Sequence, residues 1–183
     1  MPETTLQSQR VFDGRLIQVE VLEVAAAGGR RARREIVRHP GAVAVWARAP
    51  DGRFVFVRQF RKAVEQPLLE IVAGTREPGE PAEACARREI REETGYAVQT
   101  LAPLGLIVTA PGFCNERIDL FYAELAGRGA PQPDADECLD VVLLDAPGWR
   151  AMIARGAVSD AKSLAAWALV QARCGMKHVE RGA

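Results

Sequence analysis

The sequence predicts an α+β layered domain in which β-rich runs lie on both sides of one central helix. The chain has 183 residues, of which 48% are hydrophobic and 26% are charged. These fractions are typical of a soluble globular protein, and the length suits one domain with a sizeable core. The apolar patterns run in the order strands, one helix, further strands and two C-terminal helices, which favours helices packed on a sheet.

The first part of the chain is β-rich and divided by turn signals. Residues 1–8 are polar and are expected to be loose. Asp13-Gly14 is a hairpin signal that splits residues 9–24 into two strands. Pro50-Asp51-Gly52 is a second hairpin signal. The other strands expected before the helix are 30–37, whose arginines suit a solvated edge, then 42–46, 54–60 and 68–72.

The central helix is predicted over residues 82–94. Pro81 suits the first helical position, where a missing N–H is tolerated, and Gly95 is well placed to end the helix. Apolar residues recur every fourth position from Ala82 to Ile90 and form a thin stripe. Small side chains in that stripe would let the helix approach a sheet closely.

The rest of the chain alternates strands and loops before two helices. Pro103 allows only an interrupted or an edge strand. Asp160 is expected to cap the last helix. The expected elements are strands 98–108, 118–125 and 138–144, a helix over 147–154, and an amphipathic helix over 161–174 through Leu164, Trp167, Ala168 and Gln171.

Charge and composition exclude several classes of function. Lys+Arg and Asp+Glu both number 24, so no global charge attracts nucleic acid or an anionic membrane, and neither is expected as a partner. The N-terminus lacks the apolar core of a signal peptide and no apolar run approaches a membrane span, so a cytoplasmic protein is expected. Four scattered cysteines and two histidines do not favour a zinc or redox site.

Acidic residues crowd the second half of the central helix. Glu89 and Glu93 are four residues apart and share one face, and Glu92 is three residues from Glu89. Arg88 can reach Glu92 at the same spacing. Carboxylates this dense repel one another unless a cation lies among them. The stretch therefore predicts a divalent-metal site on a helix.

The spacing of this stretch resembles the Nudix box at every fixed position. It reads Gly74, five residues, Glu80, seven residues, Arg88-Glu89-Ile90, one residue, Glu92-Glu93, one residue and Gly95, with Tyr96 in place of the final aliphatic residue. The resemblance implies the α/β/α Nudix sandwich, a mixed sheet between helices. It also implies hydrolysis of a nucleoside diphosphate linked to another group, with Mg²⁺ or Mn²⁺. Such cations take hard oxygen ligands and screen a polyanionic diphosphate from its nucleophile.

The resemblance also implies roles on and beside the helix. Glu89 and Glu93 would bind the metal together with the backbone carbonyl of Ala73. Glu92 would be a further ligand or a hydrogen-bond acceptor behind the ligands. Arg88 would orient Glu92 rather than touch the substrate.

The flanking segments resemble the ADP-ribose pyrophosphatase branch of that family. They include Arg58-Gln59-Phe60-Arg61, Leu68-Leu69-Glu70-Ile71-Val72-Ala73-Gly74 and Ala110-Pro111-Gly112-Phe113, and the resemblance covers residues 10–170. It implies that ADP-ribose is cleaved to AMP and ribose 5-phosphate. GDP-mannose or another nucleoside diphosphate sugar is the alternative substrate, and a nucleotide-sensing module without turnover is the alternative of another class. The branch is typically homodimeric, so residues 1–40 are expected to form a strand region at the dimer interface and residues 41–183 the Nudix hydrolase domain.

The branch further implies contacts with the substrate. Arg61 would grip the diphosphate through its bidentate guanidinium. Arg34 would reach the nucleotide of the partner subunit, and Glu70 would accept from the adenine amino group. Gly112 and Phe113 would lie against the terminal ribose.

The catalytic base is expected in a late loop. Glu137 is the candidate for deprotonating the attacking water, or for serving as an additional metal ligand. Asp134, Asp136 and Glu116 compete for the same role.

Overall fold

The computed structural model describes residues 2–131 and 138–179. The chain divides into two compact units, one of residues up to Gly41 with Val108–Arg117, the other of Ala42–Ile107 with the chain from Ile118 onward. We describe each unit by itself.

The larger unit is built on a mixed seven-stranded sheet. The strand order is β10-β5-β4-β9-β8, with β6 paired to β5 and β7 paired to β4. β4 runs parallel to β9 and antiparallel to β5 and β7. The strands are β4 (Ala42–Arg48), β5 (Phe54–Arg61), β6 (Gln66–Glu70), β7 (Val72–Thr75), β8 (Tyr96–Val108), β9 (Arg117–Arg128) and β10 (Leu139–Leu144).

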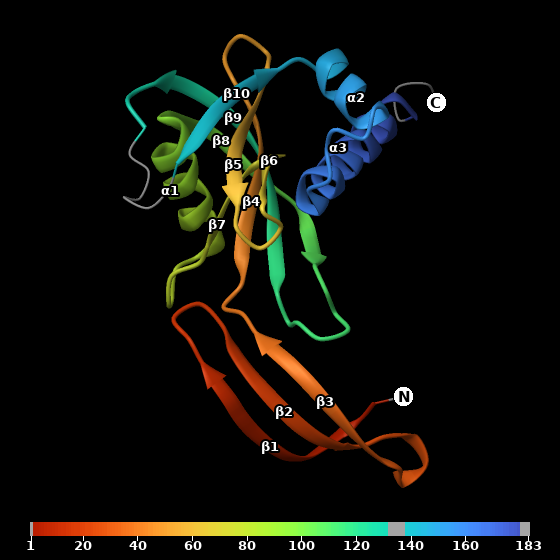
Figure 1. The fold of residues 1–183 in the computed structure, drawn as a ribbon. Helices are drawn as coiled ribbons and strands as arrows, with labels where there is room; N and C mark the ends of the chain where they lie inside the picture. Colours follow the sequence, from red (N-terminus) through yellow and green to blue (C-terminus); the bar gives the residue numbers. More distant parts are fainter. Residues whose placement is uncertain (1, 132–137, 180–183) are drawn as a thin grey trace. The chain divides into compact units, whose positions relative to one another are not determined.

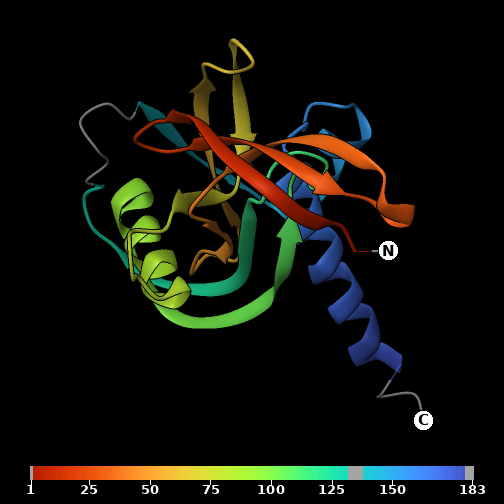
Figure 2. The same ribbon diagram turned by 90° about the horizontal axis from the view of Figure 1, so that it is seen from below.

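Helices cover both faces of this sheet, with α1 (Ala82–Thr94) on one side and α2 (Ala146–Ala154) and α3 (Ala161–Val179) on the other (Figures 1 and 2). The central strand β4 is buried on both faces, and its side chains alternate between the two layers. Val43 and Val45 pack in the core beneath α1, whereas Ala44 and Trp46 pack in the core beneath α2 and α3. The predicted α/β/α sandwich is confirmed.

The core on the α2–α3 side is aromatic. The Trp46 ring lies 5.3 Å from Trp149 and 5.3 Å from Trp167, and Phe56 stacks on Trp149 at 4.5 Å. Trp46, Trp149 and Phe56 are fully buried. Rings offset or edge-on at these separations add stability beyond their buried area.

The smaller unit contains a three-stranded antiparallel sheet of β1 (Thr4–Asp13), β2 (Gln18–Ala25) and β3 (Arg31–Arg38), with one 3₁₀ turn at Ala27–Gly29. The segment 108–117 joins it, since the N–H of Val37 donates to the carbonyl of Phe113 at 2.7 Å. The N-terminal antiparallel region is as predicted.

Two of the expected elements agree with the structure and one does not. The bounds of α1 agree with the predicted helix, and Pro103 is tolerated because β8 is an edge strand. The expectation that residues 1–8 are loose is wrong, because Thr4 already pairs with Ala25 of β2. Within the described residues, no helix is long and apolar enough to cross a membrane.

Candidate active site

Helix α1 has sharply defined ends. Pro81 precedes it in an extended conformation, and Gly95 ends it in the left-handed region at φ 75°. The Gly95 N–H donates to the carbonyl of Arg91 at 2.9 Å. A Cβ on Gly95 would also lie 2.4 Å from the carbonyl oxygen of Gly129, so both conformation and space require glycine here.

Two carboxylates of α1 face the protein interior. Glu89 is 8% exposed and Glu93 is 3% exposed, on the side that carries Cys85 and Ile90 into the core. The backbone of β7 approaches Glu89 closely, because a Cβ on Gly74 would lie 1.9 Å from its carboxylate carbon. Gly74 therefore makes the cradle in which the Glu89 carboxylate lies.

Arg88 forms hydrogen bonds with three glutamates, including Glu89. It donates two hydrogen bonds to Glu80, from Nε at 2.9 Å and from Nη2 at 3.0 Å. Its Nη1 donates to Glu89 at 2.7 Å and to Glu92 at 3.0 Å. Its Nη2 also reaches the carbonyl of Thr75 at 3.3 Å. One guanidinium thus ties three glutamates and the strand end together, which relieves their mutual repulsion.

These contacts shift the pKa values around Arg88. The hydrogen bonds from Arg88 lower the pKa of Glu80 from 4.5 to about 2, and those carboxylates raise the pKa of Arg88 further above its usual range. Burial raises the pKa of the Cys85 thiol to about 12. A thiol with that pKa is not a nucleophile at neutral pH.

A second charged cluster lies at the end of β5 and β6. Arg61 donates to Glu70 from Nε at 2.7 Å and from Nη2 at 2.8 Å, and Lys162 of α3 donates to the same carboxylate. Lys162 also donates to Asp160 at 2.9 Å. Burial of Glu70 would raise its pKa, but Arg61 and Lys162 outweigh this effect and hold the pKa below its usual range.

Arg61 connects this cluster to α1. Its bond to Glu70 raises the pKa of Arg61, and the negative charges of Glu93 and Asp160 add to this shift. Arg61 therefore lies within electrostatic reach of a buried glutamate of the acidic helix.

A protein-family model described as the NUDIX domain matches residues 37–166. The chain belongs to the NUDIX family. Three curated relatives are similar to it over most of its length. ADP-ribose pyrophosphatase of Bacillus subtilis (strain 168) is 38% identical over 151 residues, covering 80% of this chain and 82% of that protein. The methanol dehydrogenase activator of Bacillus methanolicus is 36% identical over 178 residues, 96% of each chain.

The third relative, GDP-mannose pyrophosphatase of Yersinia enterocolitica, is 34% identical over 136 residues, covering 69% of this chain and 71% of that protein. A solved structure described as an ADP compounds hydrolase superposes with a TM-score of 0.83 at 23% identity, covering 97% and 96% of the two chains. It shares the NUDIX fold. The predicted family and its ADP-ribose pyrophosphatase relatives are confirmed.

NUDIX enzymes act with divalent metal ions, and the donors present here fit such an ion. Glu89 supplies hard carboxylate oxygens beside Gly74 of β7, the strand that also contains Ala73, and Glu93 is a second buried carboxylate on the same helix. Among the described residues, no three His, Cys, Asp or Glu side chains already gather as a metal-binding group. Arg88 instead holds Glu89 and Glu92 by hydrogen bonds.

Several predicted residues lie in the smaller unit. Arg34 of β3 pairs with Glu3, and Phe113 is exposed in the segment after Gly112. Glu116 accepts from the Thr109 hydroxyl at 2.7 Å. The remaining candidates for the base, Asp134, Asp136 and Glu137, lie outside the described residues.

Sequence reasoning missed the role of the first turn of α3. Asp160 was expected only as a helix cap, and Lys162 was given no role. The signal in the sequence is a lysine two residues after a capping aspartate, since the ammonium group can turn back to that carboxylate. It lies in the run Ser159-Asp160-Ala161-Lys162-Ser163. The partner Glu70 is 92 residues away, so only the fold reveals the pair. Both carboxylate oxygens of Glu70 already accept hydrogen bonds from Arg61 or Lys162. The predicted hydrogen bond from an adenine amino group would be a further bond to one of these two oxygens.

Proposed function

We propose that this NUDIX protein hydrolyses the diphosphate bond of ADP-ribose, or of a similar ADP-sugar, to AMP and ribose 5-phosphate with Mg²⁺. The observation that carries the proposal is the position of Arg61. It presents a partly exposed guanidinium at the end of β5, and the negative charge of Glu93 on α1 contributes to raising its pKa. A guanidinium that can bind phosphate oxygens, together with hard carboxylate oxygens on α1, suits a diphosphate bound with a divalent ion.

The side chains divide the work as follows. Glu89, Glu93 and the Ala73 carbonyl would hold the divalent ion, which supplies positive charge against the diphosphate and makes a nearby water more acidic. Arg61 binds the diphosphate oxygens. Arg88 keeps Glu89 and Glu92 oriented. The base that takes the proton of the attacking water is proposed to be Glu137.

The two candidate substrates differ in their nucleobase, which is adenine in ADP-ribose and guanine in GDP-mannose. ADP-ribose pyrophosphatase relatives at 38% and 34% identity support an ADP-sugar. GDP-mannose pyrophosphatase relatives at 34% identity support GDP-mannose as the second candidate. A nucleotide-sensing module without turnover is disfavoured, because Glu89, Glu92 and Glu93 are all present and Arg88 holds Glu89 and Glu92 by hydrogen bonds.

The test is hydrolysis by the purified protein with Mg²⁺ of ADP-ribose, GDP-mannose, NADH and CoA, with products separated by chromatography. NADH is included because one relative is named an activator of a dehydrogenase. AMP release that is fastest from ADP-ribose is the expected result. Preference for GDP-mannose would overturn the substrate, and no turnover on any member would overturn the enzyme.

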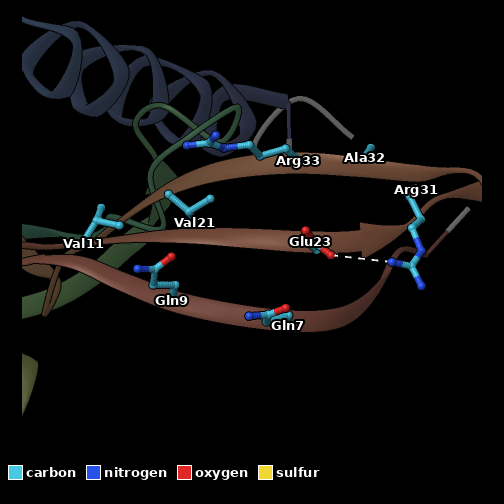
Figure 3. Close-up of a pocket in the computed structure, with 8 residues that line it drawn as sticks. All are labelled: Gln7, Gln9, Val11, Val21, Glu23, Arg31, Ala32 and Arg33. Carbon is cyan, nitrogen blue, oxygen red and sulfur yellow. Dashed lines mark ion pairs between the residues drawn. The ribbon is translucent and has the colours of Figure 1, made fainter.

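We further propose a cytoplasmic homodimer whose interface includes the β1–β3 sheet. A cavity of about 440 Å³ lies on this sheet, and Figure 3 shows its lining side chains rising from all three strands. Val11, Phe12 and Leu16 of this unit are about half exposed, with 53%, 53% and 52% of their surface accessible. Exposed apolar side chains in one unit support the proposal that this unit contributes to an interface. Sedimentation equilibrium of the intact chain and of Phe12→Asp tests this. A monomeric wild type would contradict it.

A further inference from the structure

The N-terminal turn of α3 holds a buried chain of alternating charges. Glu70, 1% exposed, accepts from Arg61 on one side and from Lys162 on the other. Lys162 in turn donates to Asp160 at 2.9 Å. The sequence of charges is Arg61, Glu70, Lys162 and Asp160, positive and negative in turn, with net charge zero. Each buried charge therefore has an opposite neighbour, as burial requires.

The far end of this chain is anchored to the fold. Asp160 accepts from the Ser163 N–H at 3.0 Å and from the Ser163 hydroxyl, which caps the start of α3. The Ser163 oxygen accepts in addition from the N–H of Ile71 at 2.8 Å. Ile71 directly follows Glu70 between β6 and β7. The first turn of α3 is thereby fixed to the strand that carries Glu70.

The near end of the chain is Arg61, the last residue of β5. Glu70 takes Nε and Nη2 of Arg61, so Nη1 is the nitrogen that this pair does not engage. A bidentate pair sets the plane of a guanidinium, and with it the direction of the remaining nitrogen. If Glu70 turned, Arg61 would turn with it. Lys162 donates to the same carboxylate from the first turn of α3.

We propose that Lys162, held by Asp160, is a positioning residue that fixes Glu70 and thereby aims Arg61 at the substrate diphosphate. The inference rests on the proposed function for the part played by the diphosphate. The orientation of Arg61 is a property of the protein alone and can be measured without substrate. Lys162 touches neither the substrate nor the reacting atoms in this scheme.

The test compares Lys162→Met with Lys162→Arg, which keeps the charge and can again bridge Glu70 and Asp160. Lys62→Met is the matched control, because it also removes one lysine charge but at an exposed side chain that pairs with Glu65 on the surface. Two observables are recorded. One is the KM and kcat for ADP-ribose, and the other is the Nε–Hε NMR signal of Arg61, identified by its loss in Arg61→Lys.

In Lys162→Met we expect KM to rise about tenfold, with a smaller fall in kcat, because losing a charge-assisted hydrogen bond typically changes an equilibrium constant by that factor or more. We expect the Arg61 signal to shift and to exchange faster with water. Lys162→Arg should restore most of both observables, and Lys62→Met should leave both unchanged. Wild-type KM and an unshifted Arg61 signal in Lys162→Met would overturn the proposal, as would an equal effect of Lys62→Met.

If Lys162→Met does not fold, Asp160→Asn is the variant that tests the proposal. It keeps Lys162 but removes the negative charge that holds it. A smaller rise in KM and a smaller shift of the Arg61 signal are then expected. If the wild type does not cleave ADP-ribose, the proposed function fails while the Arg61 signal still decides the positioning role.

Discussion

The carboxylate of Glu89 fills the space that a side chain at Gly74 would take, because a Cβ on Gly74 would lie 1.9 Å from the carboxylate carbon of Glu89. The strand end and the helix are therefore fitted to each other at the position where a metal ligand is proposed. The first glycine of the box is needed for space rather than for backbone freedom, since its φ is not in the left-handed region.

Gly74→Ala is expected to lower kcat about a hundredfold, because the methyl group displaces the Glu89 carboxylate and small displacements of reacting groups have effects of that size. Gly127→Ala is the matched control, as a Cβ there meets no atom within 4 Å. Steady-state kinetics and circular dichroism of both variants make the measurement. Wild-type kcat in folded Gly74→Ala would contradict the fit between strand and helix.

Glu93→Gln is expected to remove turnover by at least about a hundredfold while leaving the fold intact, because a carboxamide is a poor ligand for a hard cation. Glu83→Gln, an exposed change on the same helix, should keep wild-type activity. Calorimetric titration with Mg²⁺ gives a second measurement. Normal activity of Glu93→Gln would refute its assignment as a ligand.

Glu80 is expected to contribute to the acid stability of the protein. Its pKa is lowered by Arg88 from 4.5 to about 2, so the folded state favours the ionised form. The stabilisation is present above about pH 4.5 and is lost as pH falls towards 2. Thermal midpoints of wild type and Glu80→Gln should converge over this window on acidification. Curves that stay parallel would show that the shifted ionisation of Glu80 does not contribute to the acid stability.

Gly95→Ala is expected to be strongly destabilising, by more than about 3 kcal/mol. A left-handed conformation costs a non-glycine residue about 1–3 kcal/mol, and the clash with the Gly129 carbonyl adds to this. Gly156→Ala isolates the conformational part, because its φ is 71° and its Cβ would meet no atom within 4 Å. Denaturant unfolding of both variants measures the difference. Equal losses would mean that the Gly129 contact relaxes freely.

Local signals were sufficient for the acidic helix. Pro81 and Gly95 act within one turn of α1, so the sequence predicts its bounds, and the edge position of the strand containing Pro103 follows from the missing N–H. The polarity of residues 1–8 was misleading, because pairing with β2 rather than an apolar face orders that strand.

Long-range geometry was not available from local patterns. The predicted apolar stripe of the last helix included Ala168 and Gln171, which are exposed, whereas Ala166 and Val170 are buried. Ser163, on the same buried side of the helix, accepts from the Ile71 N–H, and no hydropathy pattern encodes such a polar contact. The contact between Lys162 and Glu70 is hidden from sequence for the same reason.

Side chains along β4 alternate between the two faces of the central sheet, so neighbouring residues pack in different layers. Val45 lies in the layer of the acidic helix, and its neighbour Trp46 lies in the aromatic layer on the far side. A change of volume at one position is felt by the carboxylate face, and at the next by the packing of α2 and α3. Substitutions at these two neighbouring positions therefore act first on different layers of the molecule.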